Sequence, residues 1–166
     1  MLDGHESMAI AARPSKLPAQ IAFVDIGYSP LVLIAPTIQC PITEKLVTSS
    51  ETIDWSELEF IVAEQGFSRQ RLEQWWRKNN VQGKISAPVA GQEAMVSMVS
   101  LGLGMAMIPK IVLDNRPLND KVQILDSKDE PPQGFKIGLA VLHKELNDPA
   151  ISALWNIAQN MGENII

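Results

Sequence analysis

The sequence predicts an α/β fold with mainly parallel sheets, and two features of its pattern lead to this. Short apolar runs alternate with amphipathic segments along the 166 residues. Between Phe60 and Ile108 the order of these segments is strand, helix, strand, helix, strand. That order is typical of a parallel sheet with helices packed on it.

Short apolar runs indicate the strands, because each run stops at a proline, a glycine or a polar turn. Pro14 and Pro18 enforce a loop after the first run, and Pro36 and Pro109 end two later ones. A capped turn is expected at Asp54, just before one of the strands. The strands are expected at residues 8–12, 21–24, 31–35, 60–62, 85–89, 104–108, 122–125 and 135–142.

Apolar residues at helical spacing indicate the helices, and residues typical of helix ends bound them. The first helix follows the helix breaker Gly66, and Gly102 stands where the second needs a left-handed cap. The third has Asp148 as its N-cap and Pro149 at its first position. The helices are expected near 68–79, 92–101 and 149–160.

Composition favours a soluble globular protein and disfavours direct binding of nucleic acid. Hydrophobic residues make up 46% of the chain, charged residues 20%, and the net charge is −5, without the basic excess that broad phosphate contacts need. Cys40 is the only cysteine, which excludes an internal disulfide and fits a reducing compartment. With no basic and apolar leader at the start, we expect a cytoplasmic protein that does not bind membranes.

The residues with catalytic or metal-binding chemistry form no recognisable set. His5 and His143 lie in no motif with a serine or cysteine nucleophile, and no cysteine and histidine spacing suits a metal. Gly102 and Gly104 follow a helix and precede a strand, which is the reverse of a phosphate-binding loop. We therefore predict no catalytic residue, no metal and no cofactor, and hence no enzyme.

Two strand-to-helix junctions are the predicted ligand site. The carboxyl ends of parallel strands are where ligands bind in open α/β sheets. Helix N-termini present backbone N–H groups and a partial positive charge that suit a small carboxylate, and a glycine allows close approach to the backbone. The predicted contacts at these junctions are Gln65, Gly66, Phe67, Ser68 and Arg69 in the first and Gly91 and Gln92 in the second.

Several of these residues also have a purely structural interpretation. Ser68 can cap its own helix rather than bond a ligand hydroxyl, and capping is the interpretation we favour. Arg69 can form a bidentate pair with a carboxylate, or pair with Glu73 one turn on. Trp75 and Trp76 fall at core spacing and are expected to pack rather than to stack on a ligand.

The run from Glu93 to Pro109, EAMVSMVSLGLGMAMIP, resembles a pattern of the effector domains of LysR-type transcription regulators. Met8–Ala12 is similar to a strand of the same domain, and Leu33–Pro36 with Cys40 and Pro41 to the strand that enters its second lobe. The stretches 63–71 and 91–99 look most like the IlvY branch, which activates acetohydroxy acid isomeroreductase expression in isoleucine–valine synthesis.

The resemblance implies a periplasmic-binding-protein-like domain of two lobes. Lobe I would comprise 1–34 and 138–166 and be incomplete, and lobe II would comprise 35–137. It implies a fragment without the DNA-binding head, so that DNA is bound only through the missing N-terminal domain, and a dimer or tetramer at full length. It also places Arg13 where family members contact the effector, although Arg13 equally fits an ordinary loop arginine.

The function implied is sensing of a small hydroxy or keto acid co-inducer, acetolactate or acetohydroxybutyrate, to control isoleucine–valine biosynthesis genes. The alternatives are an enzyme acting on a carboxylate, similar to prephenate dehydratase, and a fragment of a solute-binding protein. The Thr-Arg-Phe signature of the dehydratases is absent, and so is an export signal. A sensor is therefore the function that the sequence favours.

Overall fold

A computed structural model describes residues 6–48, 53–114, 120–125 and 133–163. The chain forms two compact units: unit 1 comprises Met1–Ser29 and Gly134–Ile166, and unit 2 comprises Pro30–Gln133. The chain thus passes between the units after Ser29 and after Gln133. Both points lie a few residues before the lobe boundaries expected at 34/35 and 137/138.

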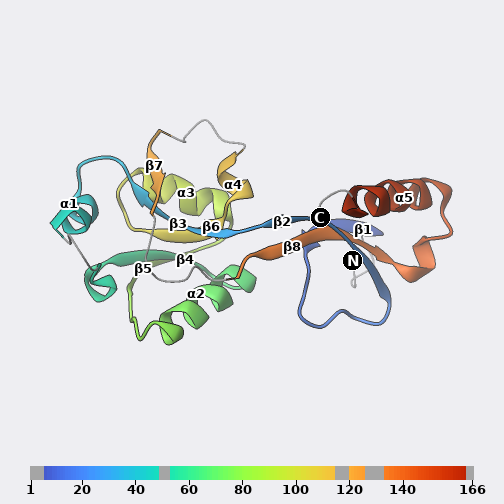
Figure 1. Cartoon of the computed structure of the whole chain (residues 1–166), viewed down its shortest axis with the longest axis horizontal. Helices are drawn as coiled ribbons and strands as arrows, with labels where there is room; N and C mark the ends of the chain where they lie inside the picture. Colours follow the sequence, from blue (N-terminus) through green and yellow to red (C-terminus); the bar gives the residue numbers. More distant parts are fainter. Residues whose placement is uncertain (1–5, 49–52, 115–119, 126–132, 164–166) are drawn as a thin grey trace. The chain divides into compact units, whose positions relative to one another are not determined.

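Unit 1 is an antiparallel sheet with a helix packed on it (Figure 1). Its strands β1 (Met8–Ala12), β2 (Ile21–Ser29) and β8 (Phe135–Leu142) lie in the order β1-β8-β2. A 3-10 turn at His143–Glu145 leads from β8 to α5 (Pro149–Glu163), which packs against β2 and β8.

The helix α5 begins where the sequence predicts, although Leu154, one of its apolar residues at helical spacing, is exposed. The Oδ1 atom of Asp148 accepts hydrogen bonds from the backbone N–H groups of Ala150 and Ile151, at 2.9 and 3.1 Å, so Asp148 is the N-cap. Apolar residues of α5 then meet those of the sheet. The buried cluster consists of Leu139, Val141, Ile151 and Ala158.

Unit 2 is a mixed sheet with helices on both faces. Two backbone hydrogen bonds of Met105 join the pair β4–β5 to the sheet β6-β3-β7. The N–H of Met105 donates to the carbonyl of Glu59 at 2.8 Å, and the carbonyl of Met105 accepts from the N–H of Ile61 at 2.7 Å. The elements are β3 (Leu31–Pro36), α1 (Pro41–Thr48), η1 (Trp55–Glu57), β4 (Glu59–Ala63), α2 (Phe67–Lys78), β5 (Lys84–Val89), α3 (Gln92–Ser100), β6 (Ala106–Pro109), α4 (Ile111–Asp114) and β7 (Val122–Ile124).

The α/β class is confirmed, but parallel pairing is confined to part of unit 2. Strands β4 and β5 are parallel, and so is the bridge between Phe60 and Met105. The pairs β1–β8, β2–β8, β3–β6 and β3–β7 are antiparallel. A helix that connects two strands returns the chain to the same edge, which makes those strands parallel. By contrast, β2 leads the chain out of unit 1 and β8 leads it back, so these neighbours run in opposite directions.

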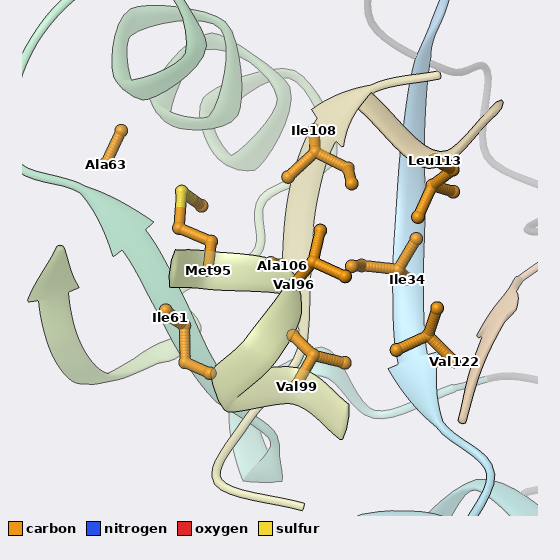
Figure 2. Packing of buried hydrophobic residues seen from close by; sticks show 10 residues of the cluster. All are labelled: Ile34, Ile61, Ala63, Met95, Val96, Val99, Ala106, Ile108, Leu113 and Val122. Carbon is orange, nitrogen blue, oxygen red and sulfur yellow. The ribbon is translucent and has the colours of Figure 1, made fainter. Parts of the chain in front are cut away.

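The two faces of the unit 2 sheet are covered by different helices. Helix α3 covers one face, and Figure 2 shows its side chains Met95, Val96 and Val99 packed against those of the sheet. The full buried cluster consists of Ile34, Ile61, Ala63, Met95, Val96, Val99, Ala106, Ile108, Leu113 and Val122.

Helix α2 covers the other face, because alternate residues of a strand point to opposite sides of the sheet. Ile61 faces α3, whereas its neighbour Phe60 meets the ring of Trp76 edge to face, with centroids 5.3 Å apart. Trp75 stacks in the same manner on Trp55 at 5.2 Å. The prediction that Trp75 and Trp76 are core residues is therefore confirmed. No helix within the described ranges is long and apolar enough to span a bilayer.

Candidate functional site

Two helices of unit 2 begin next to each other at the carboxyl ends of β4 and β5. Gly66 precedes α2 with φ +92°, and Gly91 precedes α3 with φ +91°. Residues other than glycine rarely adopt these angles, and a glycine has no side chain with which to cap a helix. The backbone N–H of Glu64 bonds the carbonyl of Val89 at 3.1 Å and holds the two turns together. Both glycines are therefore explained by the turns that they make.

A side-chain hydrogen bond links the first turns of the two helices. Nε2 of Gln92, at the start of α3, donates to Oγ of Ser68 in α2 over 2.9 Å. Ser68 is 8% exposed. The structure corrects the favoured interpretation of Ser68, because α2 begins at Phe67 after the cap Gly66, which leaves Ser68 inside the helix. This link between residues 24 positions apart has no local signature in the sequence.

The amide of Gln92 is only half satisfied. Its Oε1 atom is buried and has no hydrogen-bond partner within the described part of the chain. A buried polar atom without a partner costs about 1–3 kcal/mol. Native proteins keep few such atoms, so each one needs an explanation.

Arg69 is held by its own helix. Its Nε atom donates to Oε1 of Glu73 over 2.6 Å, which is the intrahelical pair considered from the sequence. The side chain of Arg69 is 25% exposed and that of Glu73 44% exposed. Because the pair uses Nε, the terminal Nη groups remain for a second acceptor, and none is found for them among the described residues.

The remaining predicted contacts of unit 2 lie on the surface of these junctions. Gln65, Gly66 and Gly91 are exposed in the two turns. Phe67 is the first residue of α2, and 38% of it is exposed. The structure therefore brings together all the predicted site residues that belong to unit 2.

Arg13 belongs to unit 1, where it is part of a charged network. Its Nη1 donates to Oδ1 of Asp25 over 2.8 Å, and its guanidinium lies over the ring of Phe23. Lys136 binds the other oxygen of Asp25 at 3.1 Å. Burial raises the pKa of Asp25, but the hydrogen bonds from Arg13 and Lys136 outweigh it and hold that pKa below its usual value. The role of Arg13 as a ligand contact stays a prediction.

Lys110 lies at the same edge of the unit 2 sheet and was not among the predicted contacts. It directly follows β6, whose carboxyl end shares an edge with that of β4 because the two strands run parallel. Nζ of Lys110 donates a hydrogen bond to Oδ1 of Asp114 at 2.7 Å and so forms an ion pair within the chain. A basic residue directly after a strand was the signal that could have found it.

No cluster of three or more potential metal ligands occurs among the described residues. What the unit offers instead is a pair of helix N-termini at the carboxyl edge of parallel strands, with an arginine beside them. These are features of a domain that binds a small anionic ligand.

The chain belongs to the LysR substrate-binding domain family, whose model matches residues 2–162. It is 41% identical over 163 residues to the HTH-type transcriptional regulator IlvY of Escherichia coli K12, which covers 96% of this chain and 54% of that protein. The IlvY activator of Haemophilus influenzae is 38% identical over 149 residues, which is 89% of this chain and 50% of that protein. The chain thus spans about half the length of these relatives.

Solved effector domains share the fold. The effector-binding domain of QuiR in complex with shikimate matches with a TM-score of 0.75 and 22% identity, over 99% of this chain and 76% of that one. The regulatory domain of CcmR from Synechocystis PCC6803, in complex with 2-PG, gives 0.77 and 20% over 99% and 77%. The periplasmic-binding-protein-like class is confirmed, and the chain is a regulatory ligand-binding domain rather than an enzyme.

Proposed function

We propose that this chain senses a small hydroxy or keto acid, acetolactate or acetohydroxybutyrate, and thereby controls genes of isoleucine–valine biosynthesis. The observation that carries the proposal is the junction of α2 and α3, where the Gln92–Ser68 hydrogen bond holds two glycine-started helix N-termini together. The likeness to IlvY regulators supports the choice of pathway.

The carboxylate of the ligand lies at the two helix N-termini. The partial positive charge of each helix stabilises an anion there, and the favourable interactions offset the cost of removing one carboxylate from water. The Nη groups of Arg69 supply a charged donor to the same carboxylate. Gln65, Phe67 and the backbone of Gly66 and Gly91 complete the site within unit 2.

Sensing requires more than affinity. The acid must bind one conformational state of the regulator more tightly than another, because a ligand with equal affinity for both states shifts nothing. In the whole regulator, which acts in the cytoplasm as a dimer or tetramer, this preference reaches DNA through a separate DNA-binding domain.

The proposal is tested by calorimetric titration of this chain with acetolactate and with acetoin. Acetoin is what remains when acetolactate loses its carboxylate, so it is a matched ligand without the anionic group. We expect acetolactate to bind and acetoin to bind at least about tenfold more weakly. The spontaneous decay of acetolactate, followed by NMR, should be no faster with the chain than in buffer alone. Equal binding of the two compounds, or no binding of acetolactate at millimolar concentration, would refute the proposal.

A further inference from the structure

The unpaired amide oxygen of Gln92 has a consequence for ligand choice. Nε2 of this amide is occupied by Ser68, while the buried Oε1 accepts no hydrogen bond within the described ranges. An amide oxygen can only accept hydrogen bonds, so its partner must be a group that carries a donor hydrogen. A carboxylate, a keto oxygen and an ether carry no such donor, whereas a hydroxyl does.

The position of Gln92 places this acceptor next to the proposed carboxylate site. Gln92 is the first residue of α3, and its amide reaches Ser68 in the first turn of α2. The amide therefore lies between the two helix N-termini. Gln92 as a whole is only partly buried, so its flexible side chain can turn the oxygen toward a ligand while its backbone stays in α3.

From these contacts we infer that Gln92 selects acids that carry a hydroxyl beside the carboxylate, by accepting the hydrogen bond of that hydroxyl at Oε1. The inference rests on the proposed function, and it assigns to Gln92 the recognition of the hydroxyl that acetolactate and acetohydroxybutyrate carry beside their carboxylate. Sites built to bond a hydroxyl reject the analogue that lacks it, because their polar group is then left without a partner.

The test compares three acids that share one carbon skeleton: 2-hydroxybutanoate, 2-oxobutanoate and butanoate. Each is titrated into this chain and into Gln92→Met, which keeps the length of the side chain and removes the amide. Gln159→Met, on the exposed surface of α5, is the matched control, and circular dichroism checks that each variant is folded.

For the unaltered chain and for Gln159→Met we expect 2-hydroxybutanoate to bind about tenfold more tightly than either other acid. In Gln92→Met the three affinities should become equal within about twofold. A preference for the hydroxy acid that survives in Gln92→Met would overturn the inference, and so would equal affinities or a preference for the keto acid in the unaltered chain. Those outcomes leave the proposed function standing, whereas failure of all three acids and of acetolactate to bind would refute both.

Discussion

Replacing Arg69 by alanine should weaken ligand binding while leaving the stability of the fold almost unchanged. In the folded chain Arg69 pairs with Glu73, and the two side chains are 25% and 44% exposed. A partly exposed pair one helical turn apart contributes about 0.3–0.5 kcal/mol, so Arg69→Ala should hardly change the free energy of unfolding. If the Nη groups bind the carboxylate of the ligand, however, the same change removes a charged hydrogen bond worth about 1.5–3 kcal/mol. That range corresponds to a loss of affinity of roughly 10- to 150-fold.

The control for this prediction is Arg71→Ala on the same helix. Arg71 lies two residues further along α2, and its Nη1 makes an exposed contact with Gln74 at 3.4 Å. Both variants remove one positive charge, so general electrostatic attraction falls equally in both. Calorimetry with acetolactate should show the large loss for Arg69→Ala alone, and thermal unfolding should show both variants to be stable. An unchanged affinity in folded Arg69→Ala would refute the assignment of Arg69 to the site.

Further predictions concern the two cores and the charged network of unit 1. A methyl group at Gly138 would collide with the ring of Phe23, so Gly138→Ala should lower the free energy of unfolding by about 1–3 kcal/mol in denaturant titrations. Met95 is 1% exposed, and Met95→Ala should cost about 2–5 kcal/mol; a loss below 1 kcal/mol in the same assay would contradict the packing around α3. The pKa of Asp25 is held below its ordinary value of 3.8, so its ion pair with Arg13 stabilises the fold above about pH 4. That stability is lost as the pH falls through the lowered pKa. In Asp25→Asn the melting temperature should therefore fall less steeply with decreasing pH in this acid range.

Local patterns in the sequence predicted most of the secondary structure. The apolar run at Met8–Ala12 forms β1 with the expected bounds, and the cap Asp148 starts α5 as proposed. Gly102 adopts φ +77° at the end of α3, where the pattern required a left-handed residue. These features depend on a few neighbouring residues, which is why a single sequence is enough to find them.

Features that depend on distant residues were predicted less well. The periodicity of a strand does not state its direction, so antiparallel pairing of β2 with β8 was not foreseen. The two junctions were found because each follows a strand and contains a glycine. The choice of Gln92 as partner of Ser68, in place of a helix cap, depends on how α2 and α3 come together on the sheet.

The most direct test of the central claim is to map acid binding on the backbone amide resonances of this chain by two-dimensional NMR. Addition of acetolactate should shift the amides of Ser68, Arg69 and Gln92 most, because they begin the two helices that hold the carboxylate. The amides of Gly83 and Gly102, before β5 and after α3, should not move, because they lie at the other ends of these elements. Shifts centred on Gly83 and Gly102, or no shifts at the start of α2 and α3 under saturation, would contradict a ligand site at these helix N-termini.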